Sequence, residues 1–522
     1  MADDPPIHRF LEDSADRRPG ADVLVHGDLR VTYGELEEGS NRLAAALRRQ
    51  GVERGQRVAL LAENGRDYVT AFFGILKAGA VVVALNHANR PRNHRRLLAD
   101  SGAVALVTRA AQAGRDLPDL VAGLDDLRCI VTDDRHPSWN LPPRFTLLDG
   151  ADVARCPAGR EWLDVGAGDT AAILYTSGST GLPRGVTLTH ANLAANTRQI
   201  LAYLPLAPED SVLVVLPFHY AYGNSLLLTH VCAGGRLVVD NRVAFPPAVV
   251  ETLASERVTG FAGVPSTYAM LLAKSGFLSA DLSHLRYITQ AGGSMPPAVT
   301  RTIREAMPAR VAVYVMYGQT EASARLSYVP PDRLLEKLGS IGIPIPGVEL
   351  ELVSPDGRAC GPDEVGEIVA RGDNIMKGYW NDPAETARVI DDKGLRTGDL
   401  ARRDADGFLF IVDRIKNMIK VGANRVSARE IEDVVCEVQG VAEACVVGLP
   451  DPLLGEAIEA FVVPVRPDGV DPRQVLSHVR ENLAPYKLPR CVHILDELPR
   501  TPAGKVDKRA LRAAAEAAAS AG

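Results

Sequence analysis

The sequence predicts an α/β protein: a large N-terminal domain of α/β subdomains plus a small β-rich subdomain, then a small α+β C-terminal domain. Short apolar runs alternate with amphipathic helical segments over most of the chain, which is typical of a parallel sheet. From residue 339, short strands and Gly/Pro turns take over. At 522 residues the chain exceeds what one hydrophobic core usually serves, and its last block of about 100 residues is large enough to be a domain.

The N-terminal part alternates strands and helices in order along the chain. Periodicity predicts a helix over 40–49, a strand over 57–61, a helix over 67–77 and a strand over 80–85. Residues 100–132 repeat the pattern. We expect the Pro-rich segment that follows, 136–168, to be irregular.

A loop rich in glycine and hydroxyl side chains follows an apolar strand at 171–174 and precedes a capped helix start at 189. Glycines let backbone N–H groups converge on an anion, while hydroxyls and a guanidinium add donors and charge. The residues concerned are Thr176, Ser177, Gly178, Ser179, Thr180, Gly181 and Arg184. The P-loop triplet Gly-Lys-Ser/Thr is absent, so the loop predicts polyphosphate binding of another kind. Taken alone, it is equally consistent with a solvated turn.

Polar clusters follow two later strands. The strand at 211–216 ends in the cluster 217–223, and the strand at 310–315 runs into 317–321; short strands at 236–239 and 260–264 lie between them. Ligands of open α/β sheets bind at the carboxyl ends of strands, so we expect both clusters to face a ligand.

The last third of the chain has a sequence typical of β-strands and contains two further motifs. Strands are predicted at 348–353, 367–371, 408–412, 444–449 and 457–464. The motifs are Thr-Gly-Asp-Leu at 397–400 and a charged segment at 413–420. Ser427 and Glu430 form a capping box that opens a helix through 435. We expect the Ala-rich tail after 511 to fray.

Composition excludes several classes of protein. Hydrophobic residues at 46% and charged residues at 24% match an ordinary globular protein, and a net charge of −7 argues against general nucleic-acid binding. The first residues show no secretory signal, and the apolar run 72–85 is too short for a membrane span, so we expect a cytoplasmic protein. The seven scattered cysteines and 11 histidines show no ligand spacing, and we assign them neither metal nor disulfide.

These clusters, in this order, resemble the adenylate-forming superfamily of acyl-CoA synthetases, aryl-CoA ligases, luciferases and peptide-synthetase adenylation domains. The resemblance covers nearly the whole chain. It implies a two-step reaction in which a carboxylate attacks the α-phosphate of ATP, releasing pyrophosphate, and a thiol then displaces AMP. It also implies ATP, Mg²⁺ and CoA, or a phosphopantetheine carrier protein, as cofactors or partners, and a mobile C-terminal domain.

The resemblance assigns roles to the matching residues. Lys505 would bridge the carboxylate and the α-phosphate, Thr320 would donate to that phosphate, and Glu321 would hold Mg²⁺. Asp399 would contact the two ribose hydroxyls, and Arg414 would lie against the ribose or a phosphate. Tyr317 would stack near adenine, with Gly318 and Gln319 completing the nucleotide contacts.

The resemblance also implies a hinge at Lys416, between a domain of residues 1–415 and one of residues 416–522. Rotation there would withdraw Lys505 and bring Lys420 to the site for the thiol step. Read alone, Lys420 is equally an exposed surface charge. His219 would gate the substrate tunnel.

The acid is expected to be an aryl or a short- or medium-chain acyl acid. Relatives that activate amino acids carry Asp directly after the Phe of the 217–223 cluster, and here His219 follows Phe218. The pocket residues implied by the resemblance are His219, Tyr222, Asn224, Ser225, Gln290, Gly292, Gly293, Met316 and Ala322. The phosphate loop departs from the family by carrying Arg184 where Lys is usual, so a planar fork replaces a point charge.

Two other functions stay open on the sequence. An adenylating enzyme could pass its product to a carrier protein or an amine, or could activate a small inorganic acid such as nitrite. A nucleotide-binding protein without turnover is disfavoured because Lys505, Glu321 and Asp399 are all present.

Overall fold

The structure is a computed structural model that describes residues 5–161, 163–176, 183–415, 418–422, 424–466, 469–500 and 506–521. By its internal contacts the chain divides into two compact units. The first comprises Met1–Leu338, Gly342–Leu350 and Ala370–Leu395, and the second comprises Gly339–Ile341, Glu351–Val369 and Arg396–Gly522. The hinge at Lys416 lies outside the described residues, and the predicted domain boundary beside it stays a prediction.

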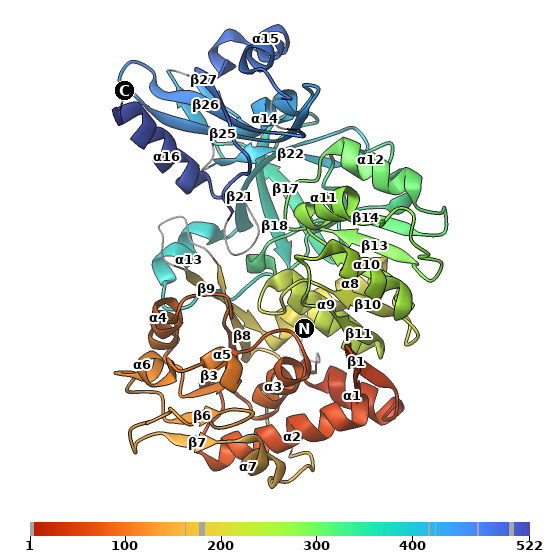
Figure 1. Ribbon diagram of the computed structural model, residues 1–522, viewed down its shortest axis with the longest axis vertical. Coiled ribbons are helices and arrows are strands. Elements are labelled where there is room, and N and C mark those ends of the chain that lie inside the picture. The colour runs from red at the N-terminus through yellow and green to blue at the C-terminus, as the bar shows by residue number, and fades with distance from the viewer. Residues whose placement is uncertain are drawn as a thin grey trace. The chain divides into compact units, whose positions relative to one another are not determined.

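A nine-stranded sheet in the first unit contains the strands predicted at 211–216, 236–239, 260–264 and 310–315 (Figure 1). Strands β1, β11, β10, β12, β13 and β14 run parallel in that order, with β2 antiparallel at one edge and β15 and β16 at the other. The strands are β1 (Asp22–His26), β2 (Leu29–Thr32), β10 (Ser211–Val214), β11 (Arg236–Val239), β12 (Gly260–Gly263), β13 (Tyr287–Gln290), β14 (Ala312–Tyr317), β15 (Ser327–Val329) and β16 (Ile343–Pro344).

An eight-stranded sheet of the same unit has the order β19-β9-β8-β4-β3-β5-β6-β7. Each of the neighbouring pairs in the run β8-β4-β3-β5-β6-β7 is parallel. Strand β9 is antiparallel to both β8 and β19. The strands are β3 (Arg57–Leu61), β4 (Val81–Ala84), β5 (Ala105–Thr108), β6 (Cys129–Val131), β7 (Thr146–Leu148), β8 (Thr170–Thr176), β9 (Arg184–Thr189) and β19 (Gly378–Tyr379).

The glycine-rich loop joins two antiparallel strands, so its predicted place between a strand and a helix is wrong. Thr176 at the end of β8 pairs with Arg184 at the start of β9. Residues 184–189 form a strand because Val186 and Leu188 are fully buried and Gly185 packs so closely that a Cβ would lie 2.8 Å from Ile173. Helix α8 (His190–Tyr203) begins only after β9, capped by Thr189 as predicted.

Helices cover these two sheets, and two of them revise the predicted boundaries. Helix α2 (Tyr33–Arg49) begins earlier than residue 40, because Thr32 and Glu35 form a capping box there. The segment 136–168 is not wholly irregular, since it holds β7 and α7 (Gly150–Ala154). The remaining helices are α1 (Arg9–Arg17), α3 (Arg66–Lys77), α4 (Pro91–Ser101), α5 (Ala110–Ala113), α6 (Leu117–Val121), α9 (Ala221–Ala233), α10 (Pro246–Ser255), α11 (Pro265–Lys274), α12 (Pro297–Ala306) and α13 (Pro383–Val389), with short 3₁₀ turns η1 (Thr320–Ala322) and η2 (Pro331–Arg333).

The predicted β-rich part forms a sheet in the order β17-β18-β21-β20, with β22 paired to β21. The strands are β17 (Val348–Val353), β18 (Gly366–Gly372), β20 (Ile390–Asp391), β21 (Gly394–Arg403) and β22 (Leu409–Arg414).

A last sheet, in the second unit, packs helices on both faces. Its strands are β23 (Ile419–Val421), β24 (Asn424–Val426), β25 (Val441–Asp451), β26 (Gly455–Pro464) and β27 (Cys491–Ile494). Helices α14 (Ala428–Cys436) and α15 (Pro472–Asn482) share an apolar cluster with one face, and α16 (Lys508–Ala521) packs on the other (Figure 1). A short 3₁₀ turn, η4 (Pro485–Lys487), follows α15.

Two details of this unit differ from the prediction. Ser427 caps α14, but Glu430 pairs with Lys487 through both carboxylate oxygens, at 2.6 and 2.7 Å. The Ala-rich tail is helical, because alanine favours helix and because Leu511 and Ala515, one turn apart, are both buried.

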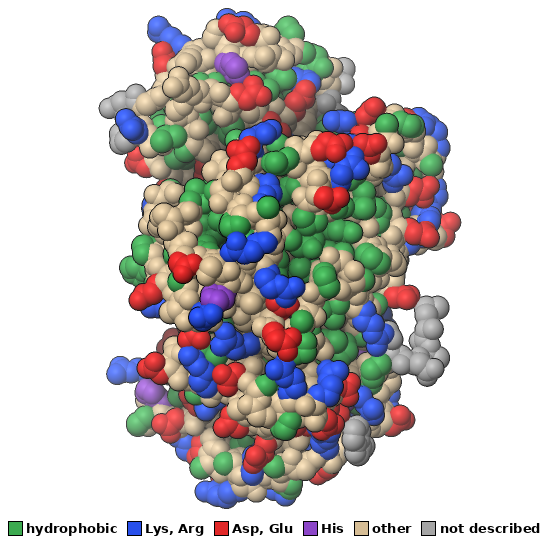
Figure 2. Space-filling model, turned by 90° about the vertical axis from the view of Figure 1, so that its right-hand side faces the viewer, with side chains coloured by type: hydrophobic (Ala, Val, Ile, Leu, Met, Phe, Trp, Pro, Cys, Tyr) green, Lys and Arg blue, Asp and Glu red, His purple; other side chains and the backbone are tan. Residues whose placement is uncertain are grey.

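No helix of the described residues is long and apolar enough to cross a membrane. On the face shown in Figure 2, acidic and basic side chains are interspersed, not separated by sign.

Candidate active site

The predicted ligand-binding clusters lie along one edge of the nine-stranded sheet. Strands β10, β12, β13 and β14 are parallel neighbours, so the segments that follow them emerge at the same edge. These segments are 217–223 after β10, 264–265 after β12, 291–293 after β13 and 318–321 after β14. The clusters that follow β10 and β14 therefore emerge at one edge of one sheet.

The turn after β14 is tightly fitted. A Cβ on Gly318 would lie 1.9 Å from the carbonyl oxygen of Ala324, so only glycine fits there. The carbonyl of Glu321 accepts a 2.8 Å hydrogen bond from the backbone N–H of Met376. Residues 317–321 are each half-buried, so the packed turn keeps part of Tyr317, Gln319, Thr320 and Glu321 accessible.

A polar network joins this turn to the end of the glycine-rich loop. The Tyr379 hydroxyl donates to Glu321 Oε1 at 2.9 Å, and the Arg184 guanidinium lies 5.6 Å from the centroid of the Tyr379 ring. Arg184 Nη1 also pairs with Glu385 Oε1 at 2.7 Å. Burial, and then the Glu321 carboxylate, raise the pKa of Tyr379 well above its ordinary value, so this hydroxyl remains a donor.

The network fits a nucleotide with Mg²⁺. Glu321 offers a carboxylate whose orientation is fixed through one oxygen, and Mg²⁺ takes oxygen ligands from one or two carboxylates plus phosphates. Arg184 supplies charge at the end of the loop. When bound, Mg²⁺ would neutralise charge on the phosphates.

Asn64, which the sequence did not single out, holds the segment that leads to His219. Its side chain donates to the carbonyl of Leu216 and accepts from the N–H of Phe218, both at 2.9 Å. These bonds fix the chain on either side of Pro217, while Gly223 lies so near this segment that a Cβ would meet the Pro217 oxygen at 2.1 Å. The position of the next residue, His219, follows from this pinning.

His219 is buried and electrically neutral. Burial, and then the nearby His87 and His94, lower its pKa to about 3. Its Nε2 atom has no hydrogen-bond partner, and neither has His87 Nδ1, whose ring meets His219 edge-on at 5.9 Å. His219 can therefore accept or donate a hydrogen bond to a ligand but supplies no positive charge near neutral pH.

A buried arginine stacks on Tyr222, a predicted pocket residue. The Arg325 guanidinium lies 4.0 Å from the Tyr222 ring centroid, and the Tyr222 hydroxyl is bonded to Thr289 Oγ1 at 2.8 Å. Arg325 is only 3% exposed, its Nε has no hydrogen-bond partner, and no described carboxylate forms an ion pair with it. The Nδ2 donor of Asn224, at 2% exposure, is also unpartnered.

The other pocket candidates use their polar groups internally or have none. Ser225 Oγ donates to the carbonyl of Tyr222 at 2.7 Å, and Gln290 Nε2 donates to the carbonyl of Gly293 at 2.8 Å. Gly292 has φ of 82°, a conformation that favours glycine. Met316 accepts a hydrogen bond from Tyr203 on sulfur, and Ala322 is fully buried. The Ser225 hydroxyl and the Gln290 amide nitrogen are therefore already bonded within the protein.

In the second unit, the predicted ribose contacts form a cross-strand pair. Asp399 on β21 lies opposite Arg414 on β22, and Arg414 donates from Nε at 2.5 Å and from Nη2 at 3.2 Å. Asp399 is buried, so the guanidinium balances its charge and fixes its plane. Lys420 is exposed on β23, where its backbone N–H donates to Glu456.

Several predicted residues lie outside the described part of the chain. They are Ser177, Gly178, Ser179, Thr180, Gly181, Lys416 and Lys505. In turn, sequence reasoning missed Asn64, Arg325, Tyr379 and Glu385. A signal existed for two of them: Asn64 follows a predicted strand, and Arg325 interrupts a weakly polar run.

The chain is similar to known proteins over most of its length. A model of the AMP-binding enzyme family matches residues 11–380, and one of the AMP-binding enzyme C-terminal domain matches residues 430–505. A feruloyl-CoA synthase of an Amycolatopsis species is 37% identical over 497 residues, covering 95% of this chain and 96% of the relative. An indoleacetate–CoA ligase of Aromatoleum aromaticum is 33% identical over 513 residues, covering 97% of each.

A solved structure has a similar fold. The anthranilate CoA ligase AuaEII in complex with anthranoyl-AMP superimposes with a TM-score of 0.88 at 28% identity, covering 99% of this chain and 98% of that one. The predicted α/β fold class is thereby confirmed, as is the use of ATP, Mg²⁺ and CoA. The chain belongs to the AMP-binding enzyme family, in which it is an ATP-dependent, AMP-forming ligase that joins a carboxylic acid to CoA.

Proposed function

We propose that the acid is an aromatic carboxylic acid that carries an oxygen substituent. The proposal depends on two buried, unpartnered donors, Asn224 Nδ2 and Arg325 Nε, beside the predicted acid pocket. A donor buried without a partner costs about 1–3 kcal/mol, and more if it is charged. An acceptor on the substrate would offset that cost.

The charge of Arg325 strengthens the case for an oxygen acceptor. A guanidinium stays protonated in proteins, so burial cannot neutralise it. The Tyr222 ring face offsets part of the cost, on the order of 1–2 kcal/mol for a desolvated cation. A phenolic, ether or carboxylate oxygen would provide the rest, whereas a purely aliphatic chain would not.

An aromatic body fits the surroundings of these donors. Tyr222 offers a ring, and Gly292 and Gly293 add no side chains to the segment that follows β13. The similar proteins are named for feruloyl, indoleacetate and anthranilate groups, all of which contain an aromatic ring. Relatives named for long-chain fatty acids also match, at 35% identity, and represent the competing substrate class.

The residue roles remain proposals. For adenylation we propose Lys505 as the bridge between carboxylate and α-phosphate, Thr320 as a donor and Glu321 as the Mg²⁺ ligand. The nucleotide would also be held by Ser177, Gly178, Ser179, Thr180, Gly181 and Arg184, with Asp399 and Arg414 at the ribose. For the thiol step we propose Lys420, after rotation about Lys416.

We propose His219 as a neutral gate between the acid and the thiol. Because its pKa is low, the imidazole can form hydrogen bonds without carrying charge. Its Nε2 atom has no partner in the protein, so a ligand that approaches could bond to it. We also propose a cytoplasmic location, because ATP and CoA are supplied there.

The experiment is ATP-dependent pyrophosphate release over a panel of acids, with and without CoA, followed by mass spectrometry. The panel holds hydroxylated and unsubstituted aromatic acids, short- and medium-chain acids, and nitrite. We expect hydroxylated or methoxylated aromatic acids to give the highest kcat/KM and a CoA thioester. Faster turnover of medium-chain acids would contradict the proposal. Pyrophosphate without a CoA thioester would favour a carrier protein, an amine or an inorganic acid.

A further inference from the structure

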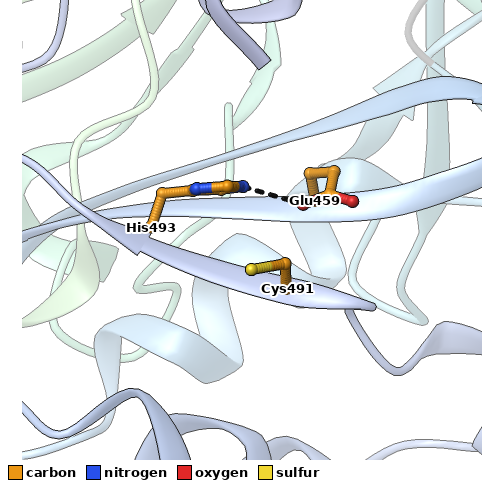
Figure 3. Close-up of side chains that lie close together, drawn as sticks. All are labelled: Glu459, Cys491 and His493. Carbon is orange, nitrogen blue, oxygen red and sulfur yellow. Dashed lines mark hydrogen bonds and ion pairs between the residues drawn. The ribbon is translucent and has the colours of Figure 1, made fainter. Parts of the chain in front are cut away.

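A group of potential metal ligands lies in the second unit, on two neighbouring strands. Strand β26 pairs in parallel with the short edge strand β27, with Glu459 opposite Cys491 and Phe461 opposite His493. Side chains two residues apart in a strand share a face, so Glu459, Cys491 and His493 all project from the same side of the sheet. Figure 3 shows the His493 imidazole reaching along the strands toward Glu459 on β26, with Cys491 on β27, the strand that also carries His493.

Their ligand atoms are already close together. One carboxylate oxygen, the imidazole nitrogen and the thiol sulfur all lie within 4.8 Å of one another. Ligands of a tetrahedral zinc ion lie roughly 3.5 Å apart, given metal–ligand bonds of about 2.0–2.3 Å. Closing the remaining gap needs movement of about 1 Å, which the exposed Cys491 side chain can make by rotation.

Two of the three ligands are held in place by their neighbours. Glu459 is 3% exposed, and Arg490 donates to its carboxylate Oε1 from Nε at 2.7 Å. The other oxygen, Oε2, lies 2.8 Å from His493 Nε2, and the His493 ring stacks on Phe461 at 4.8 Å. In metal sites, residues outside the ligand set likewise hydrogen-bond the ligating carboxylate and hold the ligating imidazole in position.

We propose that Glu459, Cys491 and His493 form a Zn²⁺ site with an open fourth position for water. One thiolate, one imidazole and one carboxylate suit zinc, whereas Mg²⁺ prefers oxygen ligands alone. Zinc would insert between Glu459 Oε2 and His493 Nε2, and Cys491 would lose its proton to solvent on binding. The site is separate from the Mg²⁺ that the ligase uses with ATP.

Zinc there would tie an edge strand to its neighbour. Strand β27 is four residues long and pairs only with β26 among the described strands. A ligand that binds the folded state and not the unfolded one stabilises the fold by mass action. Zinc should therefore raise the thermal midpoint of the second unit.

The test is Zn²⁺ titration of the full-length, chelator-treated protein, by calorimetry and by competition with a chromogenic chelator. We expect one tight site, weakened at least about 10-fold in Cys491→Ser and in His493→Gln. Co²⁺ should give a thiolate-to-metal absorption band in the wild type that Cys491→Ser lacks.

Matched controls lie in the same unit. Cys436 is another exposed thiol, and His478 pairs with Glu437 at 3.2 Å without forming such a three-ligand group among the described residues. Cys436→Ser and His478→Gln should leave the affinity unchanged. Equal Zn²⁺ affinity in the wild type and Cys491→Ser, or a thermal midpoint that zinc does not raise, would overturn the proposal.

Discussion

The nucleotide side and the acid side that we propose for the first unit differ in how their polar groups are paired. On the nucleotide side, Arg184 pairs with Glu385, and Glu321 accepts from Tyr379. On the acid side, His219, Asn224 and Arg325 each carry a buried nitrogen without a hydrogen-bond partner.

This difference indicates two modes of recognition. Where each polar side chain is already bonded to another protein group, the side chains are held in place before the cofactor binds. The protein groups that hold them can also compete with the cofactor for the same bonds. A pocket with unmet donors is stable only at a cost that its ligand offsets, so it discriminates among acids by their acceptors. Each prediction below tests one side of this comparison.

The largest effect is expected at Glu321. Glu321→Gln keeps the shape but removes the charge that a hard cation needs, so kcat for pyrophosphate release should fall roughly 100-fold or more. Tyr379→Phe, which removes only the supporting hydrogen bond, should cost less than about 10-fold. A rate within fivefold of wild type for Glu321→Gln would exclude this residue from metal binding.

A second effect is on stability at acid pH. Burial lowers the pKa of His8 and His219 to about 3 and of His190 and His230 to about 4. The unfolded chain binds these protons near pH 6.5 and the folded chain does not, so stability should fall as the pH drops from 6.5 toward 3. At pH 5 each histidine should cost on the order of 2 kcal/mol.

Urea unfolding of the wild type and of His219→Gln between pH 4.5 and 7 checks this expectation. The slope of unfolding free energy against pH should be shallower in the variant by about one proton. An equal slope would mean that His219 is protonated in the folded protein.

On the acid side, Arg325→Met should lower kcat/KM for an oxygen-substituted aromatic acid roughly 10-fold, the value of one charged hydrogen bond. The unsubstituted acid should be affected less than threefold, and Arg325→Lys should retain part of the preference. Equal losses on both acids would make Arg325 a structural support of Tyr222 and not a specificity residue.

A smaller effect is expected where the nucleotide side competes with its own ligand. Glu385→Gln should free the Arg184 guanidinium and lower KM for ATP by about threefold, since a half-buried ion pair contributes roughly 1 kcal/mol. An increased KM would show that Glu385 orients Arg184 for phosphate.

For the pH dependence of KM for the acid, we expect no effect from His219. With a pKa of about 3, His219 stays neutral throughout the pH range 5–9, so KM for the acid should show no histidine titration there. A titration near 6.5 that His219→Gln removes would contradict a neutral gate.

The strand ends could be predicted because periodicity reports local burial. The strand at 57–61 and the helix at 67–77 agree with β3 and α3 within one residue, and the clusters after β10 and β14 follow parallel strands of one sheet. The hairpin at the glycine-rich loop could not be predicted, because a short buried run such as 184–189 does not reveal its strand partner.

The sequence by itself determined the order of the motifs, the α/β class, and the residue types that a carboxylate, a polyphosphate and Mg²⁺ require. Only the tertiary structure decided which other side chains contact the motif residues. Tyr379 meets Glu321 across 58 residues of chain, and Arg325 reaches Tyr222 from a different strand end. Local patterns fix which face of an element is buried, whereas strand order and register, set by packing of the whole core, decide which buried groups find partners.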